Sequence, residues 1–507
     1  MFSRVSAKSV YVFLSLALIV IGVPYAMTRP WTIYADVWEQ VAAMREFARH
    51  PSNPLNPLLA LPGETSVRFT PYTLMWGMAA RLFGWSTFTL LPVVAAVNLL
   101  LIVTGIWRLS ISCFENRWLP TVWLVAMLWI WGKGYGQSNA YQLQMLLYTA
   151  PYIATFAYGL SFHALASLSQ FLRTRGMLQL VAYTMLTVIT FLSHPITAAF
   201  LIVAAGSMLL PTKSPKLIVG LQVVPLLCVV SAVVWPYFDY WHVLTSGSSE
   251  SWFTTPHFES QFAALGPAVG GLLVVVYFVV KRRHPFVVLG AILCALIYAA
   301  SYFLGILIGG RFILFGAIFL HLALALYVVE DGPRLLNGLR ERRVADILAI
   351  AVLAVLVLWG ARYRQRDVRD LGGSVAQWVR SGFSLHGRDV MSFEFLDGKL
   401  IPTDVLLAPS EYGLILPAIT GAKVVAHIHG NPLMNDDLNQ RCEAADGYYA
   451  LQNREERERV LERYSATCVL YDKPADTWEL SREMDFPANE SPAAEGERFA
   501  LYRVREN

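Results

Sequence analysis

The sequence contains few charged residues. Asp, Glu, Lys and Arg make up only 15% of its 507 residues, whereas hydrophobic residues make up 56%, and the mean hydropathy is +0.47. This composition excludes an ordinary soluble globular chain and is typical of a polytopic membrane protein. The net charge is only +4, and Lys and Arg occur in short clusters between apolar runs. Such a distribution argues against nucleic-acid binding and indicates membrane topology signals.

The sequence also lacks the common motifs of metal and nucleotide sites. Its five cysteines show no CxxC or metal-ligand spacing, and neither GxGxxG nor GxxxxGK[ST] occurs. We therefore expect no metal ion and no nucleotide cofactor. Cys228 and Cys294 lie in apolar runs, where buried and inert thiols are expected. Cys442 and Cys468 lie in the polar C-terminal part, and a disulfide between them is left open because it requires an extracytoplasmic tail and suitable geometry.

Long apolar runs alternate with loops of two kinds. Arg4 and Lys8 precede a first run at residues 10–27, which is long enough to cross the hydrocarbon core and has no clear signal-peptidase site. Every second later loop is rich in Lys and Arg, which favours a cytoplasmic position. The alternation predicts about eleven transmembrane helices, with a long, polar first loop on the extracytoplasmic side of the cell inner (plasma) membrane.

The C-terminal part of the chain changes in character. From about residue 371 onward, short apolar runs such as DVLLAP, KVVAHIHG and TCVLYDK alternate with helix-like segments, and RFALYRV reads as a final edge strand. Strands that alternate with helices predict a small α/β domain with a mainly parallel sheet. We therefore expect a transmembrane domain at residues 1–361, including a first outer loop at 29–87, and an extracytoplasmic α/β domain at 362–507.

The first outer loop carries an acidic pair. Asp36 and Glu39 are about one helical turn apart, so both can face the same way if ADVWEQVAAMREFARH is helical. A carboxylate close to lipid headgroups is partly desolvated and can serve as a general base. The alternative is that Asp36 caps the helix that follows it. Glu39 either assists Asp36 or pairs with a basic residue of the loop.

Two basic residues stand near the ends of predicted spans. Arg311 interrupts an apolar stretch in GGRF, and a guanidinium held there at a cost suits a lipid phosphate. The alternative for Arg311 is an anchor that snorkels to the membrane surface. His194 precedes Pro195 at the outer end of a span, where it either donates to a phosphate or has a structural part in the helix end.

Further candidates lie on the first outer loop. Its segment FTPYTLMWGMAARLFG is amphipathic, rich in aromatic residues and short for a crossing, so we expect a helix lying at the outer membrane surface. Tyr72 in this segment, Arg68 just before it and His50 are candidate substrate-binding residues. The basic residues Arg68 and His50 could equally bind lipid headgroups.

These features together resemble the GT-C superfamily of integral membrane glycosyltransferases. The resemblance rests on the acid Asp36 in a long outer loop after the first span, the FTPYTLMWGMAARLFG segment, Arg311 in GGRF and a C-terminal α/β domain. The loop is similar to that of bacterial enzymes that use polyprenyl-phosphate-linked sugars, such as the aminoarabinose transferases and the relatives of protein mannosyltransferases. The sequence departs from them in lacking adjacent Asp-Glu and Asp-Asp pairs, which leaves the class of acceptor open.

The resemblance implies an enzyme that transfers a sugar from a polyprenyl-phosphate donor. Asp36 matches the loop acid that acts as base on the acceptor hydroxyl, and Arg311 matches a late-span arginine that binds the lipid phosphate. The implied partners are the lipid-linked donor, membrane lipid and an envelope glycan, lipid or protein acceptor. The alternative is a transporter or flippase of a lipid-linked envelope precursor. That class typically shows internal repeats and polar residues at mid-membrane, and neither is evident here.

Overall fold

The computed structural model describes residues 6–28, 35–61, 64–134, 140–240, 255–341, 343–380, 392–428, 435–474 and 491–504. The beginning of the predicted first loop, residues 29–34, lies outside these described residues. The chain divides into two compact units. We call them the bundle unit, Met1–Ala26, Pro92–Ala232 and Phe253–Arg380, and the loop-tail unit, Met27–Leu91, Val233–Trp252 and Ser381–Asn507. The predicted domain division between residues 361 and 362 stays a prediction.

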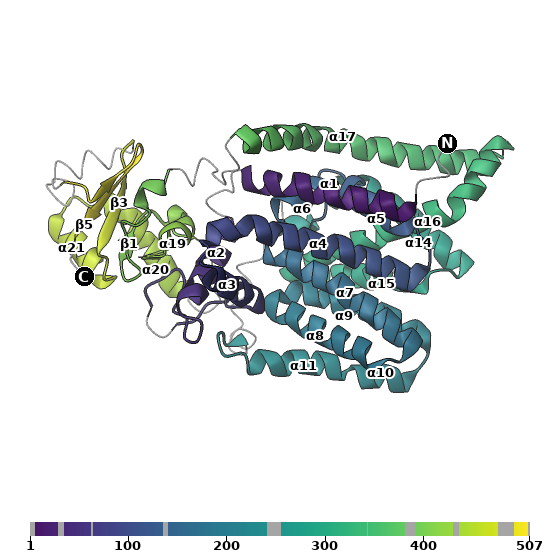
Figure 1. The fold of residues 1–507 in the computed structure, drawn as a ribbon, viewed down its shortest axis with the longest axis horizontal. Coiled ribbons are helices and arrows are strands. Elements are labelled where there is room, and N and C mark those ends of the chain that lie inside the picture. The colour runs from purple at the N-terminus through teal and green to yellow at the C-terminus, as the bar shows by residue number, and fades with distance from the viewer. Residues whose placement is uncertain are drawn as a thin grey trace. The chain divides into compact units, whose positions relative to one another are not determined.

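The bundle unit is helical. Its long helices run alongside one another (Figure 1), as expected when apolar helices bury their polar backbone groups within themselves. The α-helices are α1 Ala7–Thr28, α4 Thr87–Phe114, α5 Leu119–Trp129, α6 Leu143–Tyr148, α7 Ile153–Thr174, α8 Met177–Ser193, α9 Pro195–Leu209, α10 Pro215–Leu221, α11 Val223–Val233, α13 Gln261–Leu265, α14 Gly270–Lys281, α15 Pro285–Phe303, α16 Phe312–Arg340 and α17 Val344–Arg380. Short 3-10 turns include η2 Leu210–Thr212, η4 Thr255–Phe258, η5 Gly266–Val269 and η6 Leu307–Arg311.

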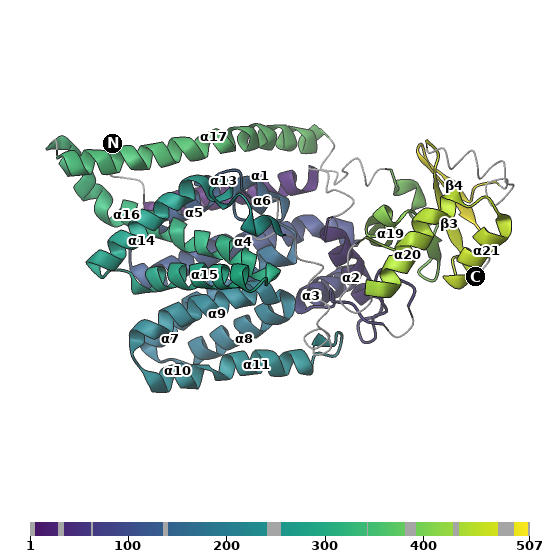
Figure 2. The same ribbon diagram turned by 180° about the vertical axis from the view of Figure 1, so that it is seen from behind.

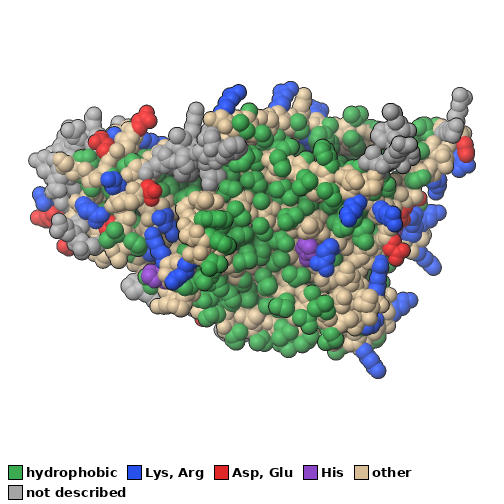
Figure 3. Space-filling view, in the orientation of Figure 1, with side chains coloured by type: hydrophobic (Ala, Val, Ile, Leu, Met, Phe, Trp, Pro, Cys, Tyr) green, Lys and Arg blue, Asp and Glu red, His purple; other side chains and the backbone are tan. Residues whose placement is uncertain are grey.

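The helices of the bundle unit confirm a multi-pass membrane protein. Within the described residues, eight helical segments are long and apolar enough to cross a bilayer, and α5 and α8 are shorter apolar helices. The predicted count of about eleven spans stays a prediction. Hydrophobic side chains cover much of the bundle on the face seen in Figure 3. Large apolar side chains such as Phe13, Leu296 and Phe303 are exposed on the bundle unit, which suits contact with lipid acyl chains.

The loop-tail unit combines two helices of the first loop with a small α/β fold. The loop helices are α2 Val37–Arg49 and α3 Pro71–Phe83. Thr70 caps α3 in a reciprocal capping box with Thr73, Pro71 opens the helix, and Gly84 ends it at φ 65°. The C-terminal elements are β1 Val405–Leu407, η8 Ser410–Tyr412, α19 Ile415–Thr420, β2 Lys423–Val424, α20 Asn435–Gly447, η9 Tyr448–Ala450, α21 Arg454–Arg463, β3 Cys468–Asp472, β4 Ala494–Glu495 and β5 Phe499–Arg503.

The sheet confirms the predicted α/β class but differs in two details. Its strand order is β2-β1-β3-β5-β4. The pairs of β1 with β2 and with β3 are parallel, whereas β5 pairs antiparallel with both β3 and β4. The sheet is therefore mixed rather than mainly parallel. The expectation that RFALYRV forms an edge strand was wrong, because the short β4 covers β5 from the outside.

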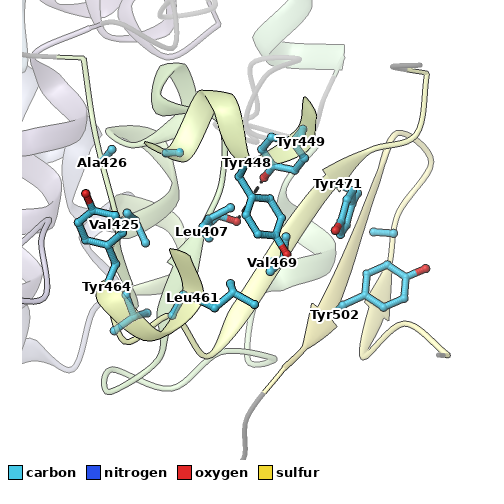
Figure 4. Packing of buried hydrophobic residues seen from close by; sticks show 14 residues of the cluster. Leu407, Val425, Ala426, Tyr448, Tyr449, Leu461, Tyr464, Val469, Tyr471 and Tyr502 are labelled. Carbon is cyan, nitrogen blue, oxygen red and sulfur yellow. Dashed lines mark hydrogen bonds between the residues drawn. The ribbon is translucent and has the colours of Figure 1, made fainter. Parts of the chain in front are cut away.

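The main core of the C-terminal fold is rich in tyrosine. Tyr448, Tyr449 and Tyr464 from the helical layer pack on Leu407, Val469, Tyr471 and Tyr502 from one face of the sheet (Figure 4). The Tyr449 hydroxyl lies 2.7 Å from the Leu470 carbonyl oxygen, to which it donates. Figure 2 shows α20 and α21 in front of the sheet. The opposite face also consists of fully buried residues such as Leu406, Leu470 and Leu501, as expected for a sheet covered on both sides.

The first loop extends this sheet at its β2 edge. Leu59 forms a parallel bridge with Val424, and the Val424 amide donates to the Leu58 carbonyl at 2.8 Å. The Asn56 side chain accepts the amides of Leu58 and Leu59 at 3.0 and 2.9 Å and so holds this segment in place. The first loop and the C-terminal fold are thus parts of one packed unit.

The cysteines form no disulfide within the described residues. All five, Cys442 and Cys468 included, are free thiols, so the bridge that the sequence left open is not made in this structure.

Candidate functional site

Asp36 lies at the N-terminus of α2. It occupies the capping position, but its side chain makes no capping hydrogen bond. The side chain is half-buried, between Ala35 and Val37, which are both buried. The structure therefore gives no support to the alternative in which Asp36 serves as the helix cap.

Glu39 is paired with Arg68. The Glu39 side chain is buried, and the Arg68 Nε donates to its Oε2 at 2.6 Å, with a second contact from an Nη nitrogen. Of the two alternatives for Glu39, the structure shows the pairing with a basic residue of the loop. A carboxylate held in this way can position the start of α2 and the segment before α3. Catalysis by Glu39 and substrate binding by Arg68 stay predictions.

The other loop candidates lie in different places. Tyr72 is fully buried in the first turn of α3. His50 is exposed and follows the last residue of α2. Because α2 has 13 residues, His50 lies about 20 Å along the helix from Asp36. The structure thus brings Glu39 and Arg68 together near Asp36 and places His50 at the far end of the helix.

Basic side chains tie α2 to the C-terminal fold. Arg45 Nη1 donates to the carbonyl oxygens of Ala418 at 3.0 Å and of Ile419, and Arg49 Nη1 donates to Gly421 at 3.0 Å. These carbonyls lie at the C-terminus of α19, where a cation is favoured. Lys423 Nζ lies 3.1 Å from Glu46 Oε2, and both side chains are buried. The helix that begins at Asp36 is therefore held by the C-terminal fold.

Arg311 stands at the junction of η6 and α16 in the bundle unit. It is half-buried and immediately precedes the long apolar helix α16. The two preceding glycines allow close packing: a Cβ on Gly309 would lie 1.8 Å from Ser301 Oγ, and one on Gly310 would lie 2.8 Å from the Cβ of His257. The GGRF pattern therefore fixes the backbone that carries Arg311.

His257 shares the electrostatic environment of Arg311. Its side chain is 2% exposed. Burial, together with the neighbouring Arg311 charge, lowers the pKa of His257 to about 4. The Tyr298 hydroxyl donates to the His257 carbonyl at 2.9 Å, and Gln261 donates to that hydroxyl at 2.9 Å. The His257 imidazole is therefore neutral at pH 7.

His194 forms the junction between α8 and α9. Its Nδ1 accepts the Thr197 amide at 3.3 Å and lies 2.8 Å from the Thr197 hydroxyl. These contacts give His194 a structural role at the N-terminus of α9, one of the two alternatives that the sequence left open. Because Nδ1 accepts the amide hydrogen, a neutral ring carries its proton on Nε2. Phosphate binding by His194 stays a prediction.

Buried polar contacts that the sequence did not single out lie near the end of α5. Arg364 of α17 is 2% exposed, donates to the Gly132 carbonyl at 2.7 Å and lies 2.8 Å from Asp367. His321 is fully buried, and its Nε2 lies 2.6 Å from the Ile130 carbonyl oxygen. The spacing of Arg364 and Asp367 by three residues is the signal that could have indicated their pairing.

The candidates are distributed over both units. Asp36, Glu39, His50, Arg68 and Tyr72 belong to the loop-tail unit, whereas His194 and Arg311 belong to the bundle unit. Within the described ranges, no three His, Cys, Asp or Glu side chains are grouped as metal ligands would be. The expectation that the chemistry needs no metal stays a prediction.

Several solved structures are similar to the chain in fold, among them the following three. ArnT from Cupriavidus metallidurans in the apo state matches with a TM-score of 0.55 and 14% identity, over 98% of this chain and 98% of that one. The oligosaccharyltransferase AglB from Archaeoglobus fulgidus, in complex with an inhibitory peptide and a dolichol-phosphate, matches with a TM-score of 0.51 and 14% identity, over 95% of this chain and 72% of that one. The Archaeoglobus fulgidus oligosaccharyltransferase tethered to an acceptor peptide matches with a TM-score of 0.50 and 14% identity, over 94% and 72%.

At the level of sequence, by contrast, no family model and no curated protein matches the chain. The likeness is therefore one of fold, carried at 14% identity by the arrangement of the helices and the C-terminal domain.

Proposed function

Because the chain has the fold of the GT-C superfamily of integral membrane glycosyltransferases, we propose that it transfers a sugar from a polyprenyl-phosphate donor to an envelope acceptor. The acceptor is a glycan, a lipid or a protein, and the reaction takes place on the extracytoplasmic face of the cell inner membrane. The observation that carries the proposal is the match to ArnT over 98% of both chains. A match of that extent includes the helical bundle, the first loop and the C-terminal fold.

In this proposal Asp36 is the general base. The oxygen of the acceptor hydroxyl forms a bond to the anomeric carbon of the donor sugar. At the same time the hydroxyl proton passes to the Asp36 carboxylate. Support comes from the half-buried position of Asp36 on the first loop, at the start of α2. The pair of the buried Glu39 and the half-buried Arg68 positions this end of the helix.

In this proposal Arg311 binds the departing phosphate and stabilises its charge. When the bond between the anomeric carbon and the phosphate oxygen breaks, the electron pair stays on the polyprenyl phosphate, and a guanidinium stabilises that charge. Support comes from the half-buried position of Arg311, whose backbone is held by the close packing around Gly309 and Gly310. His194 is the second candidate for stabilising the departing phosphate. The donor carries its leaving group, so no ATP is required.

The proposal is tested by mass spectrometry of envelope glycans, lipids and glycoproteins. The strains carry the wild-type protein, a deletion or Asp36→Asn, with membrane levels of the protein matched. We expect one sugar increment to be absent from both the deletion and the Asp36→Asn strain. The missing mass then identifies the sugar, and the molecule that lacks it identifies the acceptor.

A matched control is Glu64→Gln, which removes another acid of the same loop and is expected to keep the increment. If the deletion loses the increment while Asp36→Asn retains it, Asp36 is not the base. If the deletion changes no glycan and instead abolishes the movement of a lipid-linked precursor across the membrane, the protein is a transporter and the proposal is wrong.

A further inference from the structure

A groove of about 420 Å³ lies at the end of the bundle that carries the basic loops. It is formed where η2 follows α9 and where α14 turns into α15. Most of its lining is apolar, with Leu210, Phe278, Val288 and Leu289 among its walls. Its position at the ends of three candidate spans places it at a membrane boundary. The groove lies far from Arg311, because the 19 residues of α15 alone separate the two ends by about 28 Å.

Two cations stand at this groove without a carboxylate partner. Lys213 and Arg282 line it and are both exposed, and neither forms an ion pair with any residue that the structure describes. Their neighbour Arg283 is different, because it is paired with Asp331 at 3.1 Å and with Glu330. Arg283 is thus engaged by both nearby carboxylates, whereas Lys213 and Arg282 form no such ion pair with the residues that the structure describes.

The backbone holds the two cations in an uncommon conformation. Lys213 and Arg282 have φ angles of 51° and 53°, and His284 in the same turn has 49°. Residues other than glycine, asparagine and aspartate seldom adopt this left-handed region. The His284 Nε2 lies 2.9 Å from Glu330 Oε2 and fixes the turn against α16. The backbone therefore holds Lys213 and Arg282 in defined positions at the groove.

We propose that this groove binds an anionic phospholipid. The phosphate lies between Lys213 and Arg282, and an acyl chain lies along the apolar walls next to Phe278 and Leu289. A soluble anion would use the charges but leave the apolar wall unused, and a neutral lipid would leave the two cations unpaired. Basic loops favour the cytoplasmic leaflet, where anionic headgroups attract Lys and Arg. This inference does not depend on glycosyl transfer.

The test is native mass spectrometry of the purified full-length protein with phosphatidylglycerol or phosphatidylcholine added. We expect phosphatidylglycerol to bind wild type more tightly than phosphatidylcholine. Removing both charges in Lys213→Gln/Arg282→Gln is expected to weaken phosphatidylglycerol binding about thirtyfold, since each cation near an anionic surface contributes roughly a factor of five. The matched control Lys8→Gln/Arg175→Gln removes two exposed charges outside the groove and should bind as wild type does.

A second variant tests the apolar wall of the groove separately from the two cations. Leu289→Trp keeps both cations and fills part of the apolar wall, so it is expected to lose tight binding of phosphatidylglycerol. Equal weakening in the groove and control charge variants would show that only overall charge matters and would overturn the proposal. Inorganic phosphate that competes with phosphatidylglycerol at similar concentration would also overturn it, because the site would then bind a soluble anion.

Discussion

The pairing of Glu39 with Arg68 is a residue-scale feature with a measurable consequence. Arg68→Gln leaves the buried Glu39 carboxylate without its cation, which typically destabilises a protein by about 3 to 5 kcal/mol. The double variant Glu39→Gln/Arg68→Gln removes both charges and should recover most of that loss. Thermal unfolding of the purified proteins measures the two effects. If Glu39→Gln alone abolishes sugar transfer while stability is unchanged, Glu39 has a catalytic part and the positioning role is wrong.

His257 gives a second prediction at this scale, for the pH dependence of stability. Its pKa is about 4 in the folded protein against about 6.5 for an ordinary histidine. The unfolded chain therefore binds the proton first, and stability present above about pH 6.5 is lost as the pH falls toward 4. At pH 5 the loss is about 2 kcal/mol. We expect the unfolding temperature to fall from pH 7 to pH 5 in wild type and to fall less in His257→Gln. An equal fall in both proteins would contradict this account.

At the scale of elements, local sequence signals predicted more than long-range contacts. Pro71 and Gly84 mark the ends of α3 in the sequence itself, and the strands β1, β3 and β5 were found from their apolar runs. The two-residue β4 carries no such pattern, so the sequence predicts β5 as an edge strand. The pairing of Glu39 with Arg68 crosses 29 positions, and no periodicity specifies a contact of that separation. The sequence could indicate which residues carry charge, but only packing decides their partners.

The segment beside β2 supports an element-scale prediction. Asn56→Ala removes the side-chain acceptor of the Leu58 and Leu59 amides, and leaving such groups unsatisfied costs about 1 to 3 kcal/mol. We expect faster amide hydrogen exchange at Val424, whose amide bonds to Leu58, and unchanged exchange in the middle of β3. Exchange measured by mass spectrometry after proteolysis resolves the two regions. Asn453→Ala, at the N-terminus of α21, is a control that should leave Val424 protected.

At the scale of the whole molecule, the sequence predicts that the C-terminal fold lies on the extracytoplasmic side of the membrane, and labelling of single cysteines measures this. In a variant without native cysteines, Glu456→Cys on the exposed face of α21 should react with a membrane-impermeant maleimide in intact spheroplasts. Lys216→Cys, in a basic loop, should react only after the membrane is permeabilised. The reverse pattern would place the C-terminal fold in the cytoplasm and contradict the extracytoplasmic site.

The bridge between Leu59 and Val424 also determines when the first loop can finish folding. The two residues are 365 positions apart in the sequence. At the usual rate of about 5 to 20 residues per second, roughly 20 to 70 seconds of synthesis separate them. Until residues 418–423 have emerged, α2 lacks the carbonyls and the lysine that hold it. A ribosome that stops between Arg380 and Val424 therefore leaves a complete bundle whose first loop is still open to proteases and chaperones.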